Sequence, residues 1–123
     1  MKESGYESEA ESKRLDAVFS ALADPTRRAI LRRLTQGPAP VKSLAEPFDM
    51  SQPAVSRHLK VLETAGLVTR DVQRQTRPAT LQAQPLADAQ AWITDFEAFW
   101  TTSFDRLDAL LVDLQTQDKD DPK

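Results

Sequence analysis

The stretch SQPAVSRHLKVLETAG, residues 51–66, decides the fold of this chain. Ser51 is suited to cap a helix, and Pro53 falls in the first turn, where no backbone donor is needed. Gly66 can adopt the left-handed conformation that ends a helix. The sequence therefore predicts a helix over residues 52–65.

This helix has one apolar and one polar face. Val55, Leu59 and Leu62 recur at i, i+4 and i+7, which predicts a buried stripe. The side chains that point elsewhere are polar or basic and can exchange hydrogen bonds with a partner. The candidate contact residues on this face are Gln52, Pro53, Ser56, Arg57 and Lys60.

Three shorter helices are predicted before this segment. Apolar residues recur at helical spacing over 11–23, Asp24 can cap a helix over 25–35, and Pro47 ends a short helix over 41–46. A short helix, a tight turn and a second helix with a polar outer edge are typical of the helix-turn-helix. The first turns of such a second helix enter the DNA major groove, where Arg can pair with guanine and Gln with adenine.

A β-hairpin is predicted after this helix. LVTRDV (67–72) and ATLQA (79–83) are short strand-like runs, separated by the polar loop QRQTRP (73–78). A hairpin in this place makes a winged helix, and Arg74 and Arg77 at its tip are candidates for contact with phosphate or an adjacent minor groove. The alternative for this loop is an ordinary solvated turn.

A long apolar pattern runs through residues 86–114. It predicts one helix of about 29 residues, roughly 44 Å long, with more apolar surface than one small domain can cover. A second copy related by a two-fold axis is the commonest cover for such a surface. Aromatic residues at this spacing also allow a cofactor pocket, although packing is the commoner reason for them. The positions at strict sevens are Leu86, Ile93, Trp100, Leu107 and Leu114.

Charge is distributed unevenly along the chain. The net charge is -3, yet residues 25–78 contain ten Lys or Arg against four Asp or Glu, and both flanking segments are acidic. A basic middle between acidic ends is typical of a surface that binds a polyanion, because the local potential sets the attraction. A solvated basic face is the alternative.

Composition narrows the class of protein further. The length of 123 residues fits one domain, expected over 11–115, with disordered tails at 1–10 and 116–123. The absence of cysteine excludes disulfides, thiolate metal sites and thiol nucleophiles. With one histidine and no glycine-rich phosphate loop, we expect no enzyme. Because no apolar run could span a membrane and the N-terminus is acidic, unlike a signal peptide, we expect a cytoplasmic protein with no membrane partner.

Three segments resemble the ArsR-type winged-helix transcriptional repressors: ALADPTRRAIL (21–31), LAEPFDMSQPAVSRHLKVLETAGLV (44–68) and WITDFEAFWTTSFDRLDALL (92–111). With the hairpin, the resemblance covers residues 15–114. It implies a mainly α winged helix-turn-helix fold with about five helices, a two-stranded wing and a long C-terminal dimerisation helix. The implied function is a homodimeric repressor of a near-palindromic double-stranded DNA operator, often in its own promoter, with residues 52–65 in the major groove.

The resemblance also implies roles for further residues. Ser51 and His58 join the recognition helix, although His58 lies off its outward face, so packing and phosphate contact both stay open for it. The family's dimers pair their first and last helices. The interface implied here comprises Leu15, Phe19, Ile93, Phe96, Trp100, Leu107, Leu110, Leu111 and Leu114.

The sequence departs from the metal-sensing members of the family. Those use cysteines near the third and fourth helices, or histidine and acidic ligands on the dimerisation helix. The last helical segment here has only carboxylates, such as Asp88 and Asp95, which bind a soft or borderline metal poorly. The sequence thus resembles the metal-independent branch, with no cofactor and no specified small-molecule effector. The wing also lacks the family's usual Gly-Arg turn and aromatic residue.

A second function is consistent with the same elements. A winged helix can dock on another protein, and the long aromatic C-terminal helix would then be the docking surface. Salt separates the two functions, because binding through several phosphates weakens steeply as salt rises, whereas an apolar protein interface barely responds.

Overall fold

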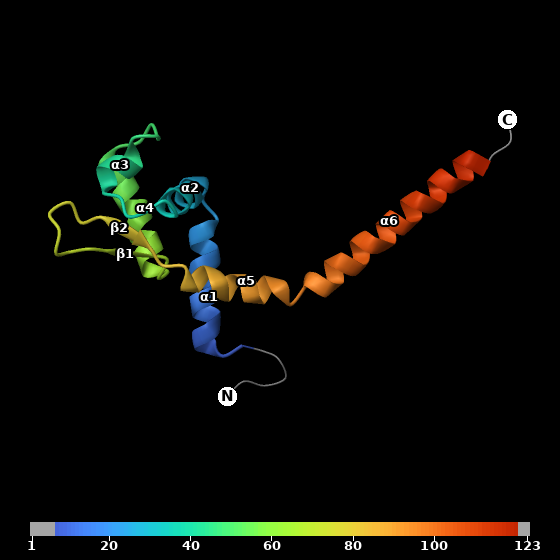
Figure 1. Cartoon of the computed structure of the whole chain (residues 1–123). Helices are drawn as coiled ribbons and strands as arrows, with labels where there is room; N and C mark the ends of the chain where they lie inside the picture. Colours follow the sequence, from blue (N-terminus) through green and yellow to red (C-terminus); the bar gives the residue numbers. More distant parts are fainter. Residues whose placement is uncertain (1–6, 121–123) are drawn as a thin grey trace. The chain divides into compact units, whose positions relative to one another are not determined.

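The structure, a computed structural model, describes residues 7–120 as six helices and two strands (Figure 1). The chain forms two compact units, one up to Ala89 and one from Gln90 onward. None of the described helices is long and apolar enough to cross a bilayer. The elements are α1 (Glu9–Leu22), α2 (Pro25–Leu34), α3 (Val41–Ala45), α4 (Gln52–Thr64), β1 (Val68–Arg70), β2 (Ala79–Leu81), α5 (Gln84–Thr94) and α6 (Glu97–Asp120).

Side-chain caps set the start of three helices. The Ser8 hydroxyl accepts from the Glu11 backbone N–H at 3.2 Å and begins α1. The Asp24 carboxylate accepts from the backbone N–H of Arg27 at 3.0 Å and begins α2. The Ser51 hydroxyl accepts from the Ala54 N–H at 3.3 Å and begins α4, as predicted. Each cap satisfies one of the backbone donors that the first helical turn leaves free.

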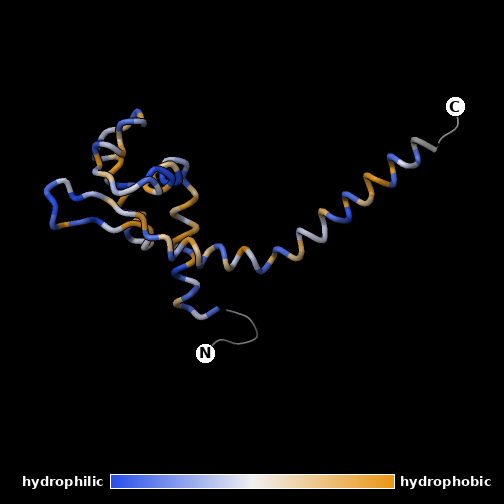
Figure 2. Tube along the Cα trace, in the orientation of Figure 1, coloured by the Kyte–Doolittle hydropathy of each residue, from blue (hydrophilic) through white to orange (hydrophobic). Residues whose placement is uncertain are grey.

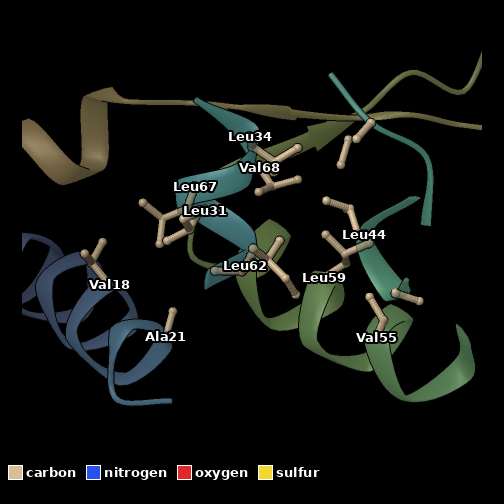
Figure 3. Packing of buried hydrophobic residues seen from close by; sticks show 14 of the residues in the cluster. Val18, Ala21, Leu31, Leu34, Leu44, Val55, Leu59, Leu62, Leu67 and Val68 are labelled. Carbon is tan, nitrogen blue, oxygen red and sulfur yellow. The ribbon is translucent and has the colours of Figure 1, made fainter. Parts of the chain in front are cut away.

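The core of the first unit is apolar, and one face of α4 borders it through Val55, Leu59 and Leu62 (Figure 3). Val55, Leu59 and Leu62 are each 0% exposed, which confirms the predicted stripe. They pack with buried residues of every neighbouring element, and among the described residues no polar or charged side chain is buried. Those neighbours include Val18, Ala21, Ile30, Leu31, Leu34, Leu44, Leu67 and Val68.

The hairpin follows α4 directly and projects from the helices (Figure 1). Gly66 has a φ of 77° and lets the chain reverse, while the Leu67 N–H donates back to the Leu62 carbonyl at 2.9 Å. β1 and β2 pair antiparallel, with Val68 opposite Leu81. Ala39 extends this ladder by one bridge to Ala79. The hairpin base is therefore held against the helix-turn-helix from two sides, and the predicted fold class is confirmed.

The predicted single helix over 86–114 is wrong, because the chain breaks it into α5 and α6 at Asp95 and Phe96. The N–H groups of these two residues bond three residues back, to the carbonyls of Trp92 and Ile93, and so tighten and end α5. Thr94 and Asp95 are weak helix formers, which explains why the break falls here. The helical spacing of apolar residues continues through the break, so this spacing does not reveal the break in the sequence.

Regular structure also extends further at both ends than predicted. α1 begins at Glu9, inside the expected tail 1–10, because Ser8 supplies a cap. α6 continues to Asp120, into the expected tail 116–123. A solvated helix end needs no apolar period, since Gln and Lys are good helix formers by themselves. The remaining parts of both expected tails, 1–6 and 121–123, lie outside the described residues.

Candidate nucleic-acid interface

The outer edge of α4 carries a row of exposed polar and basic side chains. Burial of Val55, Leu59 and Leu62 on the inner side turns the other positions towards solvent. Within the described part of the chain, the side chains of Arg57 and Lys60 form no hydrogen bond or ion pair. The exposed residues are the predicted Ser51, Gln52, Pro53, Ser56, Arg57 and Lys60.

α3 and the turn after it present the first turns of α4. Leu44 of α3 is buried against α4, and Phe48 in the turn packs partly into the core. The Phe48 N–H donates to the Ala45 carbonyl at 3.0 Å, which folds the chain back towards Ser51. The side chains of Ser51, Gln52 and Pro53, at the N-terminal end of α4, are therefore exposed.

His58 lies on the inner side of this edge. Its side chain is 19% exposed, and its Nδ1 lies 3.3 Å from Arg27 Nη1 and 3.9 Å from Asp24 Oδ2. Because a guanidinium has no acceptor, the contact with Arg27 requires an unprotonated Nδ1. The structure thus places His58 at a junction of helices rather than on the outer edge with Arg57.

Arg27 is the centre of this junction, and it was not among the residues predicted from the sequence. Its Nε donates to the Ala21 carbonyl at 2.8 Å and its Nη2 to the Ser20 carbonyl at 3.0 Å. One guanidinium thereby bonds two carbonyls at the end of α1 and also reaches α4 through His58. The capping pair of Asp24 with a residue three positions later was the only signal for it in the sequence.

The Asp24 carboxyl belongs to the same junction, and its pKa is shifted there. The hydrogen bond from the Arg27 backbone N–H lowers the pKa of the Asp24 carboxyl below its ordinary 3.8, and partial burial opposes this effect. The capping bond thus favours the charged carboxylate in the folded protein.

The wing presents two arginines on a bent loop. Arg74 and Arg77 are both exposed, and Arg74 pairs with Asp71 at 3.5 Å. Arg77 has a φ of 47°, a left-handed conformation that costs a residue with a Cβ about 1 kcal/mol or more. Its carbonyl accepts from Arg70 Nε at 2.7 Å, which holds the bend.

The base of the wing is tied to α4. Arg70 Nη1 lies 3.6 Å from Glu63 Oε1, and both side chains are partly shielded. One arginine therefore connects the wing loop, through the Arg77 carbonyl, with the last turn of α4. The two candidate DNA-contacting elements are held in one unit by this link.

This chain is similar in sequence and in fold to known transcriptional regulators. Residues 22–71 match the family described as "Helix-turn-helix domain". The HTH-type transcriptional regulator Rv2034 of Mycobacterium tuberculosis is 44% identical over 103 residues, 84% of this chain and 92% of that protein. The transcriptional repressor SdpR of Bacillus subtilis is 34% identical over 82 residues, 67% of this chain and 91% of that protein. The crystal structure of the ArsR family transcriptional regulator RHA00566 is similar with a TM-score of 0.67 and 39% identity, over 73% of this chain and 93% of that chain.

The chain belongs to the ArsR family of winged helix-turn-helix transcriptional regulators. As an ArsR-family protein it is a DNA-binding regulator, and the relatives do not favour the alternative of a protein-docking module. Regulators of this family are not enzymes, which confirms that expectation.

Metal sensing has no matching donor set in this ArsR-family chain. Among the side chains that the structure describes, no three from His, Cys, Asp or Glu are close enough together to hold an ion. The chain has one histidine and no cysteine, and His58 is engaged at the α2–α4 junction. Carboxylates alone do not suit a soft metal. Metal independence stays a prediction for this protein.

We predict that Asp24→Ala lowers the free energy of unfolding at neutral pH by about 0.5 to 2 kcal/mol, because the α2 cap is lost. Since the folded protein lowers the pKa of Asp24, the carboxylate stabilises the fold above pH 3.8, and this contribution is lost as the pH falls through the lower folded value. Urea unfolding from about pH 7 to pH 3 should therefore show the wild type converging on the variant. Asp24→Asn is the control, because it keeps the cap acceptor without titrating. Parallel pH profiles for the wild type and Asp24→Ala would contradict this role.

We predict that Arg77→Gly is more stable than Arg77→Ala by about 1 kcal/mol, because only glycine relieves the left-handed conformation at this position. Chemical unfolding of the two variants measures the difference. The same pair of substitutions at Arg74, which has no such φ, should show no advantage for glycine. Equal stability of Arg77→Gly and Arg77→Ala would show that the bend is not strained.

Proposed function

We propose that this chain is a homodimeric repressor that acts in the cytoplasm on a near-palindromic operator, with α4 in the major groove and the wing loop on the adjacent backbone. The observation that carries the proposal is the exposed edge of α4 around Arg57 and Lys60, whose side chains have no partner among the described residues, and which the buried apolar face of the helix holds in place. A side chain that has no partner in the protein can be satisfied by DNA at little cost.

Base reading is assigned to the first two turns of α4. Gln52 and Ser56 have hydrogen-bonding side chains of short or medium length, and Arg57 adds a planar group that can bind guanine O6 and N7 together. Lys60, one turn later, is suited to a phosphate. Ser51 and Pro53 lie at the helix start, close enough to the same edge to contact sugar or phosphate.

His58 has a positioning role in this proposal instead of a DNA contact. Its bond with Arg27 connects the middle of α4 to the α1–α2 corner. The wing residues Arg74 and Arg77 are assigned to phosphate or a minor groove. Arg74 can exchange its exposed pair with Asp71 for a phosphate, because an exposed pair of this kind is weak.

A single recognition helix contacts too few bases for useful specificity. Two copies related by a two-fold axis would place two α4 helices about 34 Å apart, one turn of DNA, on a near-palindromic site. The apolar residues of α5 and α6 supply the surface for such a dimer, and Figure 2 shows apolar positions recurring along both helices. Phe19 of α1 is also exposed, at 37%, and is assigned to the same interface.

The assigned interface residues are mostly exposed in the single chain. Leu15 and Trp100 are half-buried, and the others are exposed. Burial of this many large apolar side chains against a second copy would be strongly favourable, at about 25 cal/mol for each Å² removed from water. The exposed members are Phe19, Ile93, Phe96, Leu107, Leu110, Leu111 and Leu114.

We predict that Arg57→Ala weakens specific operator binding by about 1 to 3 kcal/mol and relaxes the preference at one base pair in each half-site. Bound sequences selected from random DNA, together with the protein's own promoter, supply the site, and gel shifts measure affinity. Arg14→Ala is the control, because it removes the same charge from an exposed position of α1 that is not among the assigned DNA contacts. Lys60→Ala should weaken all sequences alike and reduce the salt dependence. Unchanged affinity and base preference in Arg57→Ala would refute the assignment.

We predict that Leu107→Asp prevents dimer formation and operator binding while leaving the monomer folded. Leu107 is 51% exposed in the single chain, so the cost of the carboxylate falls on the interface, where it would be buried beside its symmetry mate. Sedimentation reports the mass, circular dichroism the fold and gel shifts the binding. Val112→Asp is a matched control, because Val112 is 58% exposed but lies about 140° around α6 from Leu107. A folded Leu107→Asp monomer that binds the full site with parental affinity would exclude the dimer.

A further inference from the structure

A groove runs between α1 and α4 beside the basic edge. Its volume is about 390 Å³, within the usual range for sites that take a small molecule. Ala17 and Ser20 line it from α1, and Val61 and Ala65 line it from α4. Because three of these four residues are small, the two helices leave the space between them unfilled.

The groove combines apolar walls with two cationic side chains. The side chains along its walls are mainly apolar, and Val61 is exposed into solvent at 38%. Arg57 and Lys60, one turn apart on α4, line the same groove. Neither cation is paired within the described residues, and no carboxylate lines the groove. A complementary ligand therefore has an apolar body and one anionic group.

We propose that this groove binds a small amphipathic monocarboxylate, and that the bound molecule competes with operator DNA. The carboxylate would lie between Arg57 and Lys60, and the apolar chain would lie along Ala17, Val61 and Ala65. Both cations belong to the DNA-facing edge in the proposed function, on which this competition rests. A ligand that neutralises them removes two favourable charges from that edge, and by linkage DNA weakens the ligand to the same extent.

The groove stays open in the proposed dimer. Ala17 lies about 160° around α1 from both Leu15 and Phe19, the residues assigned to the interface. Val18 and Ala21, between these two faces, are buried in the core. One flank of α1 is therefore available to a second copy and the other flank to a ligand. A monocarboxylate could release DNA without dissociating the dimer.

Binding is tested first without DNA. Decanoate, kept below its micelle concentration, is titrated into the full chain by calorimetry, with 1-decanol and acetate as probes that lack the charge or the chain. We expect one saturable site per chain for decanoate, and binding at least about tenfold weaker for both other probes, because each lacks one half of the complementarity. No saturable decanoate binding, or equal binding of decanol, would overturn the site.

A groove-filling variant locates the site. Ala17→Phe should abolish decanoate binding and leave operator affinity within about twofold, because Ala17 is no part of the DNA-facing edge. Ala10→Phe is the matched control, since it makes the same change at an exposed position of α1 outside the groove. Circular dichroism checks folding, and Thr64→Phe, at an exposed groove residue, serves if Ala17→Phe does not fold. Undiminished decanoate binding in a folded groove-filled variant would overturn the location.

Competition is measured last, by gel shift on the selected operator. Saturating decanoate should weaken operator binding about tenfold or more in the wild type and in Ala10→Phe, and not in Ala17→Phe. Decanoate binding with no effect on operator affinity would overturn the competition. The outcomes separate the two proposals: a chain that binds decanoate but no operator refutes the proposed function, and the competition with it, but leaves the groove site standing, whereas a chain that binds operator but no decanoate refutes the groove alone.

Discussion

The structure of the first unit depends on the burial of one stripe of α4. Val55, Leu59 and Leu62 are completely removed from water by residues from α1, α2, α3 and the hairpin. Burying one side of a helix fixes its rotation about its own axis, because a turn of even one residue, about 100°, would bring polar side chains into the core. The direction of Arg57 and Lys60 follows from this constraint. Buried apolar residues thus decide which side chains of α4 form its outer edge, although they are not exposed themselves.

Polar contacts at the edge of the core fix the orientation of α4 and of the wing, which apolar packing alone would fix less closely. Arg27 joins the end of α1 to α4 through His58, and Arg70 joins the last turn of α4 to the wing loop. These contacts are directional, so they specify the angle of α4 and the position of the wing more closely than side-chain volume can. Arg27 and Arg70, at the junctions, are therefore paired within the protein, whereas Arg57 on the outer edge of α4 has no hydrogen-bond or ion-pair partner among the described residues.

The same division extends to the apolar residues. Those of α1 to α4 and the hairpin form a closed core, while many of α5 and α6 are exposed in the single chain. A helix with a broad apolar stripe and mainly acidic charges on its other positions is better suited to pack against a second copy of the chain than to contact DNA. The acidic C-terminal segment and the basic middle of the chain thus belong to different elements. Regulation by a ligand in the α1–α4 groove would act on the basic surface alone.

The sequence by itself determined the helix-turn-helix, the hairpin and the buried stripe, because each rests on local signals. Caps at Asp24 and Ser51, the reversal at Gly66 and the apolar period of α4 act within a few residues and are confirmed where predicted. The break at Asp95 was missed, because the helical spacing of apolar residues continues through it. Only the weak helix propensity of Thr94 and Asp95 signals it in the sequence. The bond of His58 to Arg27, its place at the helix junction and the α1–α4 groove were decided only by the tertiary structure. Each depends on residues from helices that the chain brings together only on folding, and no periodicity encodes a distance between them.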